Sequence, residues 1–216
     1  SVLDESVGSV YRELNPWENM SMTQASRVKN LRASFIDAGN KEICALTGKK
    51  IVKLAHILPF PTKHHILSSL GMSGNLNNFR NVIFLCPAIE EAFDSLKISF
   101  VPDKSNPLLA DRYKMQVWKR DILEKRLYPA DLAAGVKKPH KISLYVDAVI
   151  NFNDAPQQPY RRCLSYQAFL CYWKWSREGG SVDGGPPPNF DDSDYEGNFK
   201  DNRDIYMERF VGDRNR

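Results

Sequence analysis

The stretch of sequence that decides the fold runs from Ile43 to Phe100, and its informative pieces read ICALTGKK (43–50), LAHILPF (54–60), NLNNFRNVIFLC (75–86) and PAIEEAFDSLKISF (87–100). Two short apolar runs within it have the length of β-strands. His56 lies at the end of the first run, and Asn81 opens the second. Pro87 then favours the start of a helix, because proline suits the first helical position. The stretch therefore predicts a strand, a loop, a strand and a helix.

The predicted helix, over about 87–96, carries two carboxylates on one face. Glu90 and Asp94 are four residues apart, and side chains at that spacing are neighbours on a helix surface. With His56 at the end of a strand, we expect one candidate base and two acids to converge. Taken alone, the two acids are more typical of a solvated helix face, and His56 of a hydrogen-bonded structural histidine.

Length and composition predict an ordinary globular domain. The chain has 216 residues, of which 42% are hydrophobic, which is enough to bury a core. We find no signal-peptide pattern and no run near the roughly 18 apolar residues of a membrane helix, so we expect an intracellular protein of the nucleus or cytoplasm and no membrane partner. The cysteines stand singly without a CxxC pair, which favours buried free thiols over disulfides or zinc; they are Cys44, Cys86, Cys163 and Cys171.

Charge is distributed unevenly along the chain. The formal net charge is +4, but residues 181–216 hold nine acidic and five basic residues, which leaves +8 on residues 1–180. A basic body fits a polyanionic partner such as nucleic acid, and it fits a solvated basic surface equally well. The tail is rich in Asp, Asn, Gly and Pro and poor in aliphatic residues, so we expect it to be acidic and flexible.

The flanks of the central stretch predict further elements. A helix is expected from Thr23 to a stop at Gly39, with its inward stripe formed by Ala25, Val28, Leu31 and Phe35. The segment 43–46 is predicted to be a strand, closed by a turn at 47–50 in which Gly48 supplies the unusual backbone angle. Residues 142–150 are predicted to be a strand, and the aromatic-rich segment 165–175 a buried or partner-facing helix.

Residues 111–127 are predicted to form a helix with Tyr113 inward and a basic exterior. Basic residues interleaved with Tyr113 and Trp118 could contact a phosphate backbone, although a packed helix with charged residues outside explains them equally well. The expected organisation is thus an N-terminal helical segment (1–42), a core (43–100), a C-terminal helical and strand extension (101–180) and the acidic tail (181–216).

The central residues together resemble the HNH, or ββα-metal, nuclease motif. That motif has a His after a short strand, an Asn at the second strand, and a metal ligand nine residues later on a helix; here these are His56, Asn81 and Glu90. The C-x-x-T-G, A-H-I-x-P-F and F-D pieces are similar to a subgroup common in fungi. The resemblance implies an α+β fold, with a ββα-metal motif embedded in a mainly helical single domain.

The resemblance also implies a chemistry, namely metal-dependent hydrolysis of phosphodiester bonds in DNA, with RNA as the second choice. His56 would be the general base, and Asn81 would orient it. Glu90 and Asp94 would bind a divalent ion, Mg²⁺ or Mn²⁺ rather than Zn²⁺, because their ligand atoms are oxygens. The basic residues around the motif are nucleic-acid-binding candidates: Lys49, Lys50, Lys53, His64, His65 and Arg80.

The sequence departs from the family pattern in two places. Many members have an acidic residue or a His immediately before the base, where this chain has Ala55, as does the subgroup that it most resembles. The third signature residue of the family is His, where this chain has Glu90. The alternative function is therefore an HNH-fold module that binds nucleic acid or protein with impaired catalysis. His64 and His65 match no motif position and are expected in a surface loop.

Overall fold

The computed structural model describes residues 22–58, 67, 70, 72, 76–103, 112–128, 140–152 and 158–177. Within these residues the chain is a mixed α+β structure, as expected, with two small antiparallel sheets. A mainly helical surround is not confirmed. The helices are α2 (Met22–Asp37), α4 (Pro87–Asp94) and α6 (Arg161–Arg177), and the strands are β1 (Lys53–His56), β2 (Val82–Leu85), β3 (Ile98–Pro102), β4 (Arg112–Val117) and β5 (Val149–Asn151).

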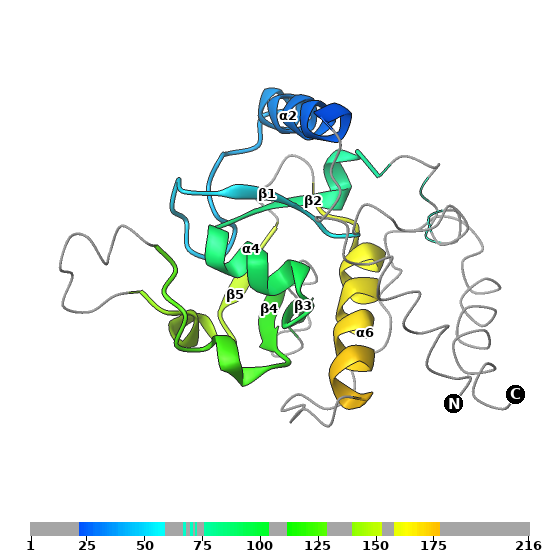
Figure 1. Cartoon of the computed structure of the whole chain (residues 1–216). Helices are drawn as coiled ribbons and strands as arrows, with labels where there is room; N and C mark the ends of the chain where they lie inside the picture. The colour runs from blue at the N-terminus through cyan, green and yellow to red at the C-terminus, as the bar shows by residue number, and fades with distance from the viewer. Residues whose placement is uncertain are drawn as a thin grey trace, which may run out of the picture.

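The β1–β2 hairpin lies between two helices, with α2 on one side and α4 on the other (Figure 1). The two strands are antiparallel in a register that pairs Leu54 with Phe84 and His56 with Val82. The ring of Phe84 meets the ring of Phe35 on α2 at a centroid distance of 5.3 Å. Because side chains alternate across a strand, the intervening pair, Ala55 and Ile83, faces α4. The two predicted strands and the predicted helix are present, and most of the predicted loop lies outside the described residues.

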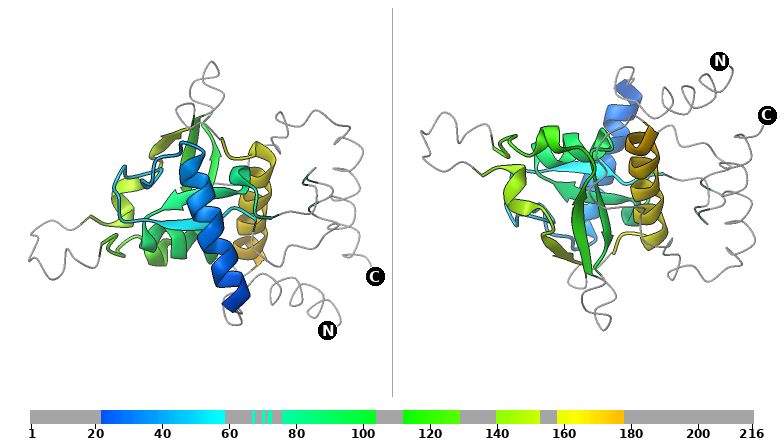
Figure 2. Two further views of the ribbon diagram at one scale, coloured as in Figure 1. Left: turned by 90° about the horizontal axis from the view of Figure 1, so that it is seen from above. Right: turned by 90° about the horizontal axis from the view of Figure 1, so that it is seen from below.

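The C-terminal end of α2 follows from the sequence, whereas Thr23, the predicted start, lies inside the helix. Leu31 and Phe35 are buried, as their spacing predicts. The helix stops at Asp37, and Gly39 then takes a φ of 87°, which is a common way to end a helix. The side chain of Asn40 donates a hydrogen bond to the carbonyl oxygen of Phe35 at 2.9 Å. Viewed from above, α2 crosses over the hairpin (Figure 2).

The segment 43–46 is a turn rather than the predicted strand. The amide of Cys44 donates to the carbonyl of Lys49, and the amide of Gly48 donates back to the carbonyl of Cys44, both at 2.8 Å. These bonds close the chain into a turn, and the amide of Ala45 within it donates to the carbonyl of Phe84 on β2 at 2.9 Å. Gly48 has a φ of 68°, which confirms the predicted role of the glycine. The four cysteines are buried free thiols, as predicted.

Residues 112–117 form strand β4, so the prediction of a helix over 111–127 is wrong. Tyr113 and Met115 are buried while their neighbours are half-buried, which is the period of a strand. β4 pairs with β3 on one side and β5 on the other. The apolar residues of this segment do have a helical spacing. Pairing with β3, however, gives the backbone groups of residues 113–117 their hydrogen-bond partners and also buries Tyr113.

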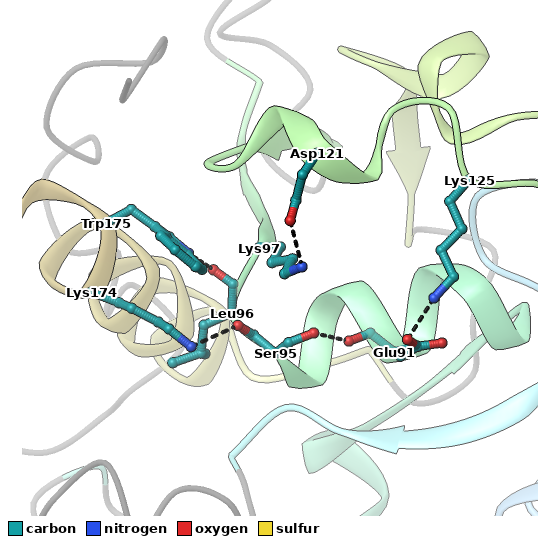
Figure 3. A network of polar contacts seen from close by, with 8 residues as sticks. All are labelled: Glu91, Ser95, Leu96, Lys97, Asp121, Lys125, Lys174 and Trp175. Carbon is teal, nitrogen blue, oxygen red and sulfur yellow. Dashed lines mark hydrogen bonds and ion pairs between the residues drawn. The ribbon is translucent and has the colours of Figure 1, made fainter. Parts of the chain in front are cut away.

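The end of α4 is held by side chains of α6. Gln167 donates to the carbonyls of Phe93 (3.4 Å) and Ile98 (3.1 Å), and Trp175 donates to the carbonyl of Leu96 at 2.6 Å. Lys174 reaches the same connection beside Trp175 (Figure 3). Carbonyls at the end of a helix have no partner within it, so α6 supplies the donors. The predicted aromatic helix is thereby confirmed, and it runs longer than 165–175.

Three other predictions meet the structure differently. Only Val149–Asn151 of the predicted strand over 142–150 is a strand, since Ile142–Tyr145 is a 3-10 helix. Residues 1–21 and the predicted acidic tail lie outside the described residues. None of the described helices is both long and apolar enough to span a membrane.

We predict a measurable energetic coupling between β3 and the end of β4. Trp118 and Ser99 are both buried, and the indole nitrogen of Trp118 donates to Ser99 Oγ at 2.7 Å. We expect Trp118→Phe and Ser99→Ala each to lower the free energy of unfolding by about 1–3 kcal/mol, because each leaves a buried polar group unpaired. In urea denaturation the double variant should lose about 1 kcal/mol less than the sum. Strict additivity would contradict this packing.

Candidate active site

His56 is the last residue of β1, and its imidazole is buried. The Nε2 atom lies 3.3 Å from Oδ1 of Asn77, within the loop that leads to β2. Burial lowers the pKa of His56 below its ordinary value, and the hydrogen bond with Asn77 acts in the opposite direction. Burial disfavours the charged imidazolium. The ring is therefore neutral at neutral pH, which is the form that accepts a proton.

Asn81 is fully buried and ties the two ends of the loop between the strands together. Its Oδ1 accepts a hydrogen bond from the amide of Leu58 at 2.9 Å, and its Nδ2 donates to the carbonyl of Leu76 at 3.0 Å and more weakly to that of Leu58 at 3.5 Å. Its own carbonyl accepts from the amide of Ile57 at 2.9 Å. The chain on both sides of the loop is thus fixed immediately after His56.

The position of Asn81 differs slightly from the sequence prediction. It ends a short 3-10 helix, η2 (Phe79–Asn81), and β2 begins one residue later. The side chain of Asn78 caps that helix by accepting a hydrogen bond from the amide of Arg80 at 2.8 Å. This brief helical turn directs the amide of Asn81 inward instead of along the strand.

Asn77 is a site residue that our sequence reasoning missed. Its side chain is the partner of His56 Nε2, so it influences which nitrogen of the ring carries the proton. The available signal was the run of asparagines just before Asn81, because a polar amide is costly to place beside an apolar strand unless it is hydrogen-bonded. Nothing in the sequence showed which of these asparagines would reach His56.

Glu90 and Asp94 are four residues apart on α4, and a lysine forms an ion pair with Glu90. Nζ of Lys53, on β1, lies 2.9 Å from Oε2 of Glu90. Burial, followed by the negative charge of Glu90, raises the pKa of Asp94 to about 8, while Lys53 lowers it. The two carboxylates are therefore close enough to repel each other, and one ammonium partly offsets that repulsion.

His56 does not join the two carboxylates in a single cluster. Among the residues that the structure describes, no three His, Cys, Asp or Glu side chains are placed to hold a metal ion together. The register explains this, because alternation puts Lys53 and Ala55 on the face toward α4, and Leu54 and His56 on the other. The expected convergence of one base and two acids is corrected to a pair of acids and a separate base.

The carboxylate pair by itself suits a hard divalent cation. It offers only oxygen ligands, and burial followed by the charge of Glu90 raises the pKa of Asp94. Mg²⁺ commonly binds through one or two carboxylates, with water and substrate phosphates completing its shell. Zinc prefers nitrogen and sulfur ligands, and neither is contributed by Glu90 or Asp94. The donor set therefore fits Mg²⁺ or Mn²⁺ held by two protein ligands.

The predicted nucleic-acid-binding residues divide into three groups. Lys49 and Lys50 are exposed at the turn before β1, and Lys53 is engaged with Glu90. Arg80 stacks on Tyr160 at 4.0 Å and donates to the carbonyl of Gln158 at 2.9 Å, so it links η2 to the start of α6. His64 and His65 lie outside the described residues.

The two aromatic residues that were predicted to accompany basic residues at a nucleic-acid surface are buried in the core instead. Tyr113 and Trp118 are each only 1% exposed, so neither can stack on a base or lie against a phosphate backbone in this structure. Both belong to the sheet formed by β3, β4 and β5 and its continuation.

The central segment matches a known family. A family model described as HNH endonuclease matches residues 44–101, which contain β1, β2, α4 and most of β3. This match supports the resemblance drawn from the sequence and, in general terms, a nuclease-type function. No curated protein and no solved structure matches the chain.

We expect Asn81→Ala to destabilise the fold more than a nearby loop substitution. Removing the amide leaves the buried groups of Leu58 and Leu76 without their partner, which should lower the free energy of unfolding by roughly 2–4 kcal/mol. Asn78→Ala is the matched control, because it removes a single capping bond in the same loop and should cost about 1 kcal/mol. Urea denaturation followed by circular dichroism measures both. Equal losses would contradict the role given to Asn81.

The raised pKa of Asp94 predicts a pH-dependent stability in metal-free protein. The folded pKa of about 8 lies above the unfolded value of about 3.9. The stability gained by the protonated carboxyl is therefore complete below about pH 4 and is lost as the pH rises through about 8. Between these limits the free energy of unfolding should fall by at most about 1.4 kcal/mol per pH unit. Asp94→Asn should flatten this slope, and an unchanged slope would be the contrary result.

Proposed function

We propose that this chain is a metal-dependent endonuclease of the HNH type that hydrolyses phosphodiester bonds in DNA, with RNA as the less favoured substrate. The observation that carries the proposal is the placement of a buried, neutral His56 at the end of β1, inside the segment that matches the HNH endonuclease family. Asn81 braces the backbone directly after it. A base needs such a fixed position to act on one water molecule.

His56 has the features of a general base. Oδ1 of Asn77 can only accept a hydrogen bond, so Nε2 carries the proton in this contact. In its neutral form the imidazole would take a proton from the attacking water. Because burial lowers the pKa of His56, the ring stays unprotonated to a lower pH than an ordinary histidine does. Asn81 acts through the backbone, by holding the residues that follow His56.

Glu90 and Asp94 would hold the divalent ion, with Mg²⁺ or Mn²⁺ preferred. When bound, such an ion polarises the scissile phosphate and stabilises the leaving oxygen. The carboxylates on α4 would thus hold the ion, and His56, at the end of β1, would activate the water. The exposed Lys49 and Lys50 and the net charge of +8 on residues 1–180 favour binding of a polyanion.

A second candidate function is a binding module with the HNH fold and impaired catalysis. Two observations favour it: the ammonium of Lys53 already contacts Glu90, and Ala55, with no ligand atom in its side chain, stands where many members of the resembled family have a metal ligand. Such a module would bind nucleic acid or protein in a salt-dependent way without cutting it.

We expect His56→Ala to lower the rate of plasmid cleavage by about 100- to 10,000-fold, the usual contribution of a general base. Supercoiled plasmid with Mg²⁺ or Mn²⁺ is the substrate, and the decay of the supercoiled form is the measurement. The wild-type rate should stay on its plateau down to a pH below the ordinary histidine value of about 6.5, because the pKa of His56 is lowered.

His140 is the matched control, since it is the other described histidine and lies in an exposed position. His140→Ala should leave cleavage unchanged. Wild-type protein that binds DNA with strong salt dependence, does not cut it, and binds equally well after His56→Ala would favour the binding module over the nuclease.

A further inference from the structure

The ammonium of Lys53 occupies the carboxylate pair from the strand side. It lies 2.9 Å from Oε2 of Glu90, and it also acts on the charge of Asp94. The side chain of Glu90 is 11% exposed, whereas that of Lys53 is 56% exposed. The lysine therefore reaches in from solvent to a carboxylate that is itself mostly covered.

The hairpin register explains why a lysine can reach this place. Lys53 and Ala55 are two residues apart on β1, so they share the face toward α4. Ala55 is buried but has no polar atom to offer the carboxylates. Along a strand the two positions are separated by about 6.6 Å, a gap that the long lysine stem spans. The positive charge beside Glu90 thus comes from Lys53, the next residue on the same strand face as Ala55.

One lysine cannot balance two carboxylates. A single ammonium offsets the charge of Glu90, while burial and that charge raise the pKa of Asp94 to about 8. A divalent cation carries enough charge to balance both carboxylates when both are ionised. The ammonium and the ion cannot share the place, because like charges at such short range repel strongly. Since Lys53 is more than half exposed, it can turn into solvent when the ion arrives, while the two carboxylates stay fixed on α4.

We propose that Lys53 is a built-in counter-ion that a divalent cation must displace from Glu90, so that Lys53 sets how tightly the carboxylate pair binds the ion. This inference rests on the metal site of the proposed function. It adds that the ammonium of Lys53 stays paired with Glu90 until the concentration of the divalent ion is high enough to displace it.

The experiment measures Mn²⁺ binding without any substrate. Free Mn²⁺ is followed by its electron paramagnetic resonance signal while it is titrated into the full chain. Lys53→Met keeps the length of the side chain and removes its charge, and it should tighten Mn²⁺ binding by at least about tenfold, because the repulsion is removed. Adding Glu90→Gln to Lys53→Met should abolish the gain, and Asp94→Asn provides a second removal of a ligand if Glu90→Gln fails to fold.

Lys125→Met is the matched control. Lys125 also pairs with a carboxylate of α4, since its Nζ lies 2.5 Å from Oε1 of Glu91, on another face of the helix (Figure 3). Lys125→Met removes one positive charge from an ion pair, as Lys53→Met does. The substitution should change Mn²⁺ affinity by no more than about twofold, since exposed charges are screened.

Three results would overturn the inference. If Lys53→Met and Lys125→Met tighten binding equally, the effect is one of net charge. If wild type binds Mn²⁺ and Lys53→Met does not bind it more tightly, the inference fails while the metal site of the proposed nuclease stands. If no variant binds Mn²⁺, the inference and that metal site fail together. If Lys53→Met binds Mn²⁺ more tightly than wild type, and wild type cuts no DNA, the inference is supported and the nuclease is contradicted.

Discussion

The amide of Asn81 is the interaction on which the rest of the central motif depends. A long segment of the chain joins β1 to β2, and its two ends must meet for the hairpin to form. Asn81 meets this need by accepting from the amide of Leu58 and donating to the carbonyl of Leu76, with its own backbone bonded to Ile57. Each of these groups is removed from water, so each needs a partner. One buried side chain thereby closes the loop and fixes the backbone beside His56.

The helix α4 is placed by a different set of contacts. Its start follows from Pro87, but its end is held by donors from α6, more than seventy residues further along the chain. Trp175 and Gln167 take up the carbonyls around Leu96, which itself has a positive φ of 60°. A non-glycine residue in that conformation persists only where its surroundings hold it there. The carboxylates of α4 are therefore presented on a firmly fixed helix.

The electrostatics of the two halves of the site are opposite in character. Burial lowers the pKa of His56 and so favours its neutral form, and Oδ1 of Asn77 lies within hydrogen-bond distance of its Nε2. Glu90 instead pairs with the ammonium of Lys53, and burial followed by the charge of Glu90 raises the pKa of Asp94 to about 8. The neutral base and the two carboxyl groups therefore lie on opposite sides of the β1–β2 hairpin. They can act separately, without sharing a proton.

The sequence by itself determined the order of strand, loop, strand and helix around Asn81, the stop of α2 at Gly39 and the shared face of Glu90 and Asp94. These follow from local periodicity, turn residues and capping, which act between residues close in the chain. Only the tertiary structure decided that residues 112–117 form a strand, that Asn77 meets His56, and that Lys53 pairs with Glu90. Each of those depends on contacts between distant segments, whose register no local pattern encodes. For the same reason the sequence wrongly placed His56 with the two acids, because its spacing could not show that strand alternation turns the base to the other face.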